Sequence, residues 1–364
     1  YPVVIGPDSS ATLARLVERH APDARVFAIY DAQLYALHGP RLRQLFGLPA
    51  KRIHELVIPN GERSKSAGTV RDIQDFLLSE EIARTDLVLA VGGGVTSDTV
   101  GFAAATLYRG VRWAIVSTTL LGMVDAAIGG KTGINHPRGK NLIGAFWQPS
   151  FVLCDTGLLH TLPDRQIIAG LGEVVKSAAL VGPRMIARLA RYVDHGDLLD
   201  ERRLGVLITE SVRYKADIVK RDETERGRRM VLNLGHTFAH GIEQALGYGK
   251  LLHGEAVLIG LLAACDLSLR MGARNPRRME EFCSVVAQFV RHIPYRQIDM
   301  DQVWEAMSYD KKRRGTRKQY ILLSALGKPY VTDQVTPSQA RAALKSALTQ
   351  YAESRGRHAA RVGS

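Results

Sequence analysis

The sequence predicts an α/β amino-terminal domain, with a parallel sheet and a Rossmann-like nucleotide site, followed by a mostly α-helical carboxy-terminal domain. Up to residue 155, short β-branched runs alternate with stretches of helical periodicity, which is the pattern of βαβ units. Beyond that point, long helical periodicities dominate. We therefore expect one domain over residues 1–155 and a second over residues 156–364.

The expected strands of the first domain are short and apolar. They cover residues 25–30, 53–58, 87–91, 113–116 and 151–154. In the second domain, helical periodicity covers residues 166–182, 184–194, 201–221, 233–246, 253–272, 276–291, 301–308 and 337–353. The one clear β feature there is the run 319–323, with 330–331 as its candidate partner.

The composition excludes several classes of protein. The chain has 364 residues, 46% hydrophobic and 23% charged, as soluble globular proteins do. No apolar run approaches the roughly 20 residues of a membrane helix, so we expect no membrane association. The three cysteines are far apart and form no CxxC pair, which favours a reducing cytoplasm over a disulfide framework.

The chain is strongly basic, with a formal net charge of +13. A surplus of this size suits nucleic acid, an acidic surface or an anionic substrate. The charge is spread along the chain, and its densest runs contain no interleaved aromatic residues. We therefore expect an anionic small molecule and no nucleic acid.

A glycine-rich turn follows the buried strand 87–91. Gly92, Gly93 and Gly94 would let the backbone approach a diphosphate, and the next helix would offer free N–H groups. The spacing is not the GxGxxG fingerprint, so a tight turn that needs glycine for positive φ explains it equally well. Asp31, after an early strand, suits either ribose binding or a helix cap.

Three segments of the second domain carry residue types that bind metals. Glu173 and Lys176 stand three residues apart on one expected helix, and His236 and His240 stand four apart on another. His253 opens a further helix. A carboxylate with two imidazoles suits Zn²⁺ and leaves a position open for a substrate oxygen. Spacing alone leaves open whether His240 is a ligand or a neighbour.

Several cations stand near these segments in the sequence. Lys131 and Lys140 occur in an expected loop that is rich in glycine and asparagine. That loop is no Walker A motif, because the pattern requires glycine where the chain has Asp125. Arg229 has three readings: it shares a helix face with His236, it lies in a lead-in loop, or it is a solvated surface charge.

Taken jointly, these segments resemble the 3-dehydroquinate synthases of the sugar phosphate cyclase superfamily, over roughly residues 1–350. The motifs that carry the resemblance are, in order, Gly92–Val95 with Asp98, Tyr108–Gly110, Thr118–Asp125, Gly129–Asn135, Gly139–Phe146, Gly172–Lys176, Asn233–Thr237, His253–Val257 and Asp310–Lys312. The chain departs from the commonest pattern at Thr96-Ser97 and at Ala239.

The resemblance implies a fold, a reaction and two cofactors. The fold would be that of the dehydroquinate synthases. The substrate would be 3-deoxy-D-arabino-heptulosonate 7-phosphate, and the products 3-dehydroquinate and phosphate. NAD⁺ would oxidise a secondary alcohol, phosphate would leave, the NADH would reduce the ketone again, and an aldol step would close the ring. A divalent metal, Zn²⁺ or Co²⁺, would polarise the hydroxyl group that is oxidised.

The resemblance also assigns roles to residues. The metal ligands would be Glu173, His236 and His253. The cofactor would contact Asp31, Glu62, Lys65, Gly92, Gly93, Gly94, Asp98, Thr118, Thr119 and Lys140. The substrate would contact Asp125, Lys131, Asn141, Lys176, Lys215, Arg229, Asn233, His240 and Lys312. Arg109 would reach the phosphate from a neighbouring subunit, which implies a homodimer.

Other activities compete with this interpretation. Related cyclases make 2-epi-5-epi-valiolone or 2-deoxy-scyllo-inosose from substrates without a carboxylate. The residues that argue against these activities are Asn233, His240, Lys215 and Arg229. Aminodehydroquinate synthase keeps the acid and is not separated. A metal-dependent polyol dehydrogenase would release NADH and need fewer cations. A non-catalytic NAD-sensing protein would have a broken ligand set.

Overall fold

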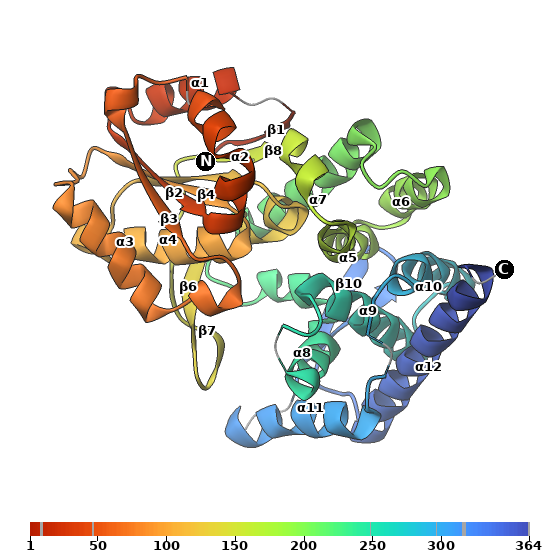
Figure 1. Ribbon diagram of the computed structural model, residues 1–364. Coiled ribbons are helices and arrows are strands. Elements are labelled where there is room, and N and C mark those ends of the chain that lie inside the picture. The colour runs from red at the N-terminus through yellow and green to blue at the C-terminus, as the bar shows by residue number, and fades with distance from the viewer. Residues whose placement is uncertain (8–9, 46, 248, 296, 315–317, 363–364) are drawn as a thin grey trace. The chain divides into compact units, whose positions relative to one another are not determined.

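The computed structural model describes residues 1–7, 10–45, 47–247, 249–295, 297–314 and 318–362. The chain divides into two compact units, Tyr1–Leu162 and Pro163–Ser364, whose α-helices and most strands are labelled in Figure 1. The expected boundary at residue 155 coincides with the end of strand β8. The first unit continues beyond it through the 3₁₀ helix η5 (Thr156–Thr161).

The first unit is built on a six-stranded sheet in which every pairing is parallel. In sheet order the strands are β1 (Val3–Gly6), β8 (Val152–Asp155), β5 (Trp113–Ser117), β4 (Leu87–Gly92), β2 (Val26–Asp31) and β3 (Ile53–Ile58). The helices are α1 (Ser10–His20), α2 (Ala32–Leu45), α3 (Ala67–Ser79) and α4 (Gly94–Thr106). The predicted α/β class and its five strands are confirmed, and β1 was not predicted.

The register of this sheet brings three strand ends together. Tyr30 on β2 is paired with Val91 on β4, and Gly92 is paired with Ser117 on β5. Because the strands are parallel, Asp31 and the segments that follow Gly92 and Ser117 all leave the sheet at the carboxyl ends of its strands. Ligands of open α/β sheets bind at the carboxyl ends of the strands.

The expected loop around Lys131 and Lys140 is instead an antiparallel hairpin, which corrects the sequence prediction. Its strands are β6 (Lys131–His136) and β7 (Gly139–Phe146), and they pair Gly133 with Gly144. A Cβ on Gly144 would lie 2.2 Å from the Thr132 carbonyl oxygen, so the glycines allow the two backbones to approach closely. The glycines that suggested a loop are therefore required by the pairing.

The second unit is mainly helical, as predicted. Its elements are α5 (Asp164–Val181), α6 (Pro183–His195), α7 (Glu201–Arg221), η6 (Arg228–Asn233), α8 (His236–Leu246), α9 (His253–Arg270), α10 (Pro276–Val290), α11 (Met300–Arg314), β9 (Tyr320–Ala325), β10 (Lys328–Thr332) and α12 (Pro337–Val362). Strands β9 and β10 form the expected antiparallel pair. None of the described helices has the length and apolar character needed to cross a membrane.

Helix α9 is the centre of this unit, since it packs against α5, α8, α10 and α12. Two of these contacts bring backbone against backbone. A Cβ on Gly254 would lie 1.7 Å from the Ala169 carbonyl oxygen, and a Cβ on Gly172 would lie 2.3 Å from the Gly254 carbonyl oxygen. A Cβ on Gly260 would lie 2.3 Å from the Gly235 carbonyl oxygen. Side chains at these positions would force α5 and α8 away from α9.

We predict that Gly254→Ala destabilises the protein by about 1–3 kcal/mol, the usual cost of overpacking, or more, because backbone atoms must move. Gly205→Ala is the matched control: Gly205 lies on α7, and a Cβ there meets no atom within 4 Å. The control should gain about 0.5–1 kcal/mol from helix propensity. Urea unfolding followed by circular dichroism measures both. Equal midpoints for Gly254→Ala and the parent would contradict the backbone contact.

Candidate active site

The glycine turn, Gly92–Gly94, connects β4 to α4 in the first unit. None of its three glycines has a positive φ, so the positive-φ explanation is wrong. Their lack of a Cβ is what matters: a Cβ on Gly92 would lie 2.5 Å from Thr96 Oγ1, and one on Gly93 would lie 3.0 Å from the Thr119 side chain. The turn thus packs tightly and leaves the first N–H groups of α4 as a site for an anion.

Polar residues around this turn are held together by Asn135. Its backbone N donates to the Lys65 carbonyl oxygen at 2.9 Å, and its Nδ2 donates to Glu62 Oε1 at 2.7 Å. Its Oδ1 accepts from the backbone N of Asn141 at 3.0 Å. Lys65 Nζ in turn lies 2.5 Å from Asp98 Oδ2. Four predicted site residues therefore form one network, and the sequence analysis gave its central asparagine no role.

Burial dominates the electrostatics of this network. It raises the pKa of Asp98, while the adjacent Lys65 ammonium opposes that rise. Lys65 is itself only 5% exposed. A buried ion pair of this kind is costly unless it also binds something or fixes a conformation.

The other predicted site residues of this unit lie at a helix cap, at a strand end and in a π-helical turn. Asp31 Oδ1 accepts from the backbone N of Gln33 and of Leu34, so it caps α2, as one of the two readings expected. Thr118 is buried and its backbone N donates to the Gly92 carbonyl oxygen. Asp125 lies in η4 (Gly122–Ala126), a π-helical turn of a kind frequent at functional sites.

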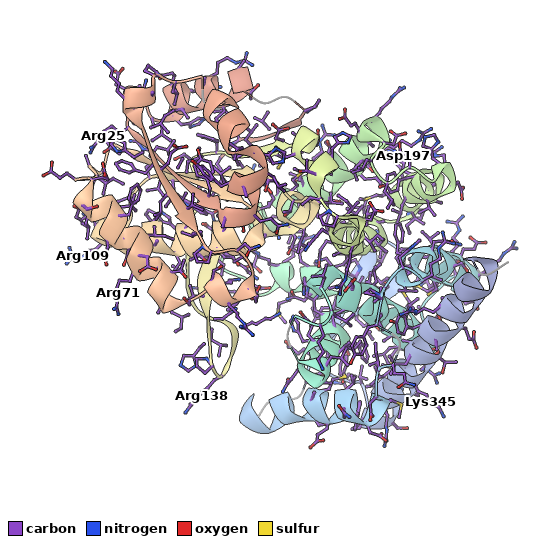
Figure 2. The ribbon with its side chains drawn as sticks, viewed as in Figure 1. Arg25, Arg71, Arg109, Arg138, Asp197 and Lys345 are labelled. Carbon is purple, nitrogen blue, oxygen red and sulfur yellow. The ribbon has the colours of Figure 1, made fainter. Side chains whose placement is uncertain are left out.

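The cations of the first unit are more exposed. Lys131 opens β6 as an exposed residue, and Lys140 is half-buried on β7. Arg109 ends η3 (Leu107–Arg109) with a φ of 62°, and its exposed side chain lies at the periphery of its unit (Figure 2). Among the described residues, no hydrogen bond or ion pair joins Arg109 to the glycine turn, and the resemblance assigned Arg109 to a neighbouring subunit's site.

In the second unit, the described residues include one group that could hold a metal ion: Glu173, His236 and His253. Their ligand atoms all lie within 4.8 Å of one another. Glu173 Oε1 lies 3.6 Å from His236 Nε2 and 3.5 Å from His253 Nε2. His240 is exposed and outside this group, although its ring packs edge-on against His236 with centroids 5.5 Å apart. The structure thus makes His240 a neighbour of the cluster.

The donor set of this cluster fits a divalent metal. Burial and the nearby Lys176 lower the pKa of His236 to about 3, so its ring is neutral, as a metal ligand must be. Burial also opposes charge on His253, but Glu173 and Glu243 outweigh it and raise the pKa of His253 to about 10, so a metal bound here would have to displace the proton on its Nε2. Lys176 forms an ion pair with Glu173. One carboxylate and two imidazoles leave a fourth tetrahedral position for another oxygen.

Arg229 is buried, with 1% of its surface exposed. Its Nη1 donates to the Glu223 carbonyl oxygen, and its backbone N donates to Asp222 Oδ2 at 2.9 Å. It lies on η6, which Gly235, with a φ of 79°, separates from α8. Arg229 is therefore neither a solvated surface charge nor part of one continuous helix with His236. It lies in the segment that leads into α8, which was the third interpretation. The helix expected to start at residue 233 starts at His236 instead.

The remaining predicted residues surround this segment. Asn233 Nδ2 donates to Glu225 Oε1 at 3.0 Å, a carboxylate that the sequence analysis missed because nothing in its spacing marks it. Lys215 is half-buried on α7. Lys312 belongs to α11, but its side chain lies outside the described part of the structure.

The amino-acid sequence matches two family models and a curated relative along most of its length. Residues 55–169 match the family described as 3-dehydroquinate synthase N-terminal, and residues 170–313 match 3-dehydroquinate synthase C-terminal. A 3-dehydroquinate synthase from Methylococcus capsulatus is 40% identical over 355 residues, which cover 95% of this chain and 96% of that protein.

Solved structures of sugar phosphate cyclases have a similar fold. A 2-epi-5-epi-valiolone synthase from Streptomyces hygroscopicus subsp. jinggangensis 5008, with NAD⁺ and Zn²⁺ bound, is 28% identical with a TM-score of 0.80, covering 96% of this chain and 97% of that one. A 2-deoxy-scyllo-inosose synthase, complexed with carbaglucose-6-phosphate, NAD⁺ and Co²⁺, shares the fold at 24% identity and a TM-score of 0.79, covering 94% of this chain and 96% of that one. Because the two family matches run without a gap from residue 55 to residue 313, the chain belongs to the 3-dehydroquinate synthase family.

Proposed function

We propose that this chain is a 3-dehydroquinate synthase, a carbon–oxygen lyase of the shikimate pathway of aromatic amino acid biosynthesis. It converts 3-deoxy-D-arabino-heptulosonate 7-phosphate into 3-dehydroquinate and inorganic phosphate. The observation that carries the proposal is the intact cluster of buried Glu173, buried His236 and half-buried His253 in a chain 40% identical to a named 3-dehydroquinate synthase. A degenerate, non-catalytic relative would have no reason to keep that cluster with its Lys176 neighbour.

Two bound groups complete the chemistry. When bound, NAD⁺ supplies a hydride acceptor that is restored within one turnover, and Zn²⁺ or Co²⁺ supplies a Lewis acid for a substrate hydroxyl group. Glu173, His236 and His253 hold the metal. The cofactor side is formed by Asp31, Glu62, Lys65, the glycine turn, Asp98, Thr118, Thr119 and Lys140.

The chain's own residues bind and orient an anionic substrate. Arg229, with its planar guanidinium, suits the carboxylate, because such a pair forms two parallel hydrogen bonds. Ammonium groups suit the phosphate as point charges. The substrate-binding set is Asp125, Lys131, Asn141, Lys176, Lys215, Arg229, Asn233, His240 and Lys312, with Arg109 contributed by a neighbouring subunit.

The alternatives are weaker. Valiolone and inosose cyclases act on substrates without a carboxylate, and the chain is less similar to them, at 28% and 24% identity, than to the 40% identical 3-dehydroquinate synthase. Buried Arg229 also supports an acid substrate. A polyol dehydrogenase would accumulate NADH, and aminodehydroquinate synthase would require an amino substrate. Both differ from the proposal in the assay below.

The proposal is tested by incubating the protein with the heptulosonate phosphate, Zn²⁺ or Co²⁺ and substoichiometric NAD⁺. We expect many phosphates released per NAD⁺, a product with the mass of 3-dehydroquinate and no net NADH absorbance. Glu173→Gln is the inactive control, because it removes the anionic ligand. NADH formed in proportion to product would instead identify a dehydrogenase.

We predict that Arg229→Met lowers kcat/KM by roughly 30- to 1000-fold, since a charge-assisted bidentate contact is worth about 2–4 kcal/mol. Arg228→Met is the matched control, because Arg228 is the exposed neighbour in the chain. Loss of that solvated charge should cost well under about 1 kcal/mol. Fluorescence titration with NAD⁺ should remain near parental for both variants. The melting temperature of Arg229→Met should fall modestly, because methionine cannot replace the hydrogen bond to the Glu223 carbonyl oxygen, and that of Arg228→Met should not change. Near-parental kcat/KM in Arg229→Met would show that Arg229 does not read the carboxylate.

We further propose a homodimer in which Arg109 acts in the neighbour's site. The support is that Arg109 is exposed, and that the β6–β7 hairpin exposes Leu142, Ile143 and Phe146, at 57%, 41% and 41% of their surface. Exposed apolar patches commonly mark protein interfaces. Besides this second copy and the substrate, we propose no nucleic-acid or membrane partner, and a cytoplasmic location that suits the three free thiols.

Mixing two inactive variants tests this arrangement. Arg109→Ala and His253→Ala should each lack activity as homodimers. After unfolding and refolding together, mixed dimers should recover activity, because one of their two sites receives both native residues. Recovery should approach one quarter of the parental rate, since random pairing yields half mixed dimers with half their sites intact. No recovery, with mixed dimers verified by mass, would contradict action across the interface.

A further inference from the structure

Both histidines of the metal cluster present Nε2 to Glu173, so their Nδ1 atoms face away from it. The Nδ1 of His236 lies 3.2 Å from the Leu234 carbonyl oxygen. The Nδ1 of His253 lies 3.5 Å from Glu243 Oε2. Each Nδ1 therefore lies near an acceptor: a backbone carbonyl oxygen for His236 and a carboxylate oxygen for His253.

Glu243 is placed for this contact by helix geometry. It lies on α8 seven residues after His236, which is two turns, so both side chains project from one face of the helix. Its side chain is only 3% exposed. A carboxylate buried to that extent is costly unless it is paired and hydrogen-bonded. The His253 ring is an ionisable partner of this carboxylate.

The contact has a specific chemical consequence. A hydrogen bond from Nδ1–H to Glu243 leaves the lone pair on Nε2, which is the atom that faces the cluster. It also fixes the rotation of the ring. Ligand histidines commonly depend on such an outer carboxylate, and its loss typically lowers metal affinity 10- to 100-fold.

We propose that Glu243 is a positioning residue for the metal site: it orients the His253 ring and selects the tautomer that offers Nε2 to the metal. The inference rests on the proposed metal site and deepens it. Neither the family resemblance nor the sequence analysis gave Glu243 a role.

The test measures metal binding on the metal-free full chain, without catalysis. Zn²⁺ is titrated in competition with a chromophoric chelator, and the visible spectrum is recorded after loading with Co²⁺. We expect Glu243→Leu to weaken Zn²⁺ binding about 10- to 100-fold and to change the Co²⁺ bands. Glu243→Gln should have a smaller effect of the same sign, because its amide oxygen still accepts from Nδ1–H.

Glu210→Gln is the matched control. Glu210 is a largely buried carboxylate of α7 that pairs with Arg188 and belongs to no metal-binding group. It should keep parental Zn²⁺ affinity and a parental Co²⁺ spectrum. Melting curves of the metal-free variants separate packing from positioning.

Parental Zn²⁺ affinity and Co²⁺ bands in both Glu243 variants would overturn the inference, even if their metal-free melting temperatures fell. In that case the parental chain would still bind metal, and the proposed function would stand. Failure of the parental chain itself to bind Zn²⁺ or Co²⁺ would overturn the metal site and, with it, the role of Glu243.

Discussion

Direct backbone contact between helices is the constraint on which the second unit depends. Gly254 meets the backbone of α5 at Gly172, and Gly260 meets the turn before α8 at Gly235. Every ligand of the metal cluster is the chain neighbour of one of these four glycines. Three helices can therefore converge closely enough for a carboxylate and two imidazoles to meet within 4.8 Å. Any Cβ at these crossings would separate donors that must stand near 2 Å from one ion.

In the first unit, the side chain and backbone of Asn135 hold polar residues from different segments together. Its polar residues come from a 3₁₀ turn, a helix and a hairpin, and the β6–β7 ladder pairs only the two hairpin strands with each other. Asn135 joins the segments by donating to one of them through its backbone and side chain and accepting from another through Oδ1. The amide suits this task because one residue offers both donors and an acceptor. Glycine contacts thus bring the candidate metal cluster together in one unit, and an asparagine network holds the candidate cofactor residues in the other.

Much of this was predictable from sequence, because the patterns were strong. Buried strands such as β4 and long amphipathic helices such as α7 have unambiguous periods, and the glutamate–histidine–histidine set is marked by motif. Two failures have physical causes. The β6–β7 hairpin was read as a loop because glycine, which usually breaks strands, here permits close pairing. Glu243 and Asn135 were missed because their roles come from contacts between segments that spacing along the chain does not encode.

Gly235, with its left-handed backbone, separates two elements of the second unit that carry different parts of the proposed site. Before it, η6 carries Arg229, which we propose reads the carboxylate; after it, α8 begins with His236, a member of the candidate metal cluster. Because η6 ends before α8 begins, the two elements have separate axes and separate packing partners: η6 contacts α7, β9 and β10, whereas α8 contacts α9 and α11. We therefore expect a replacement on η6 to alter acid recognition more than it alters the metal cluster.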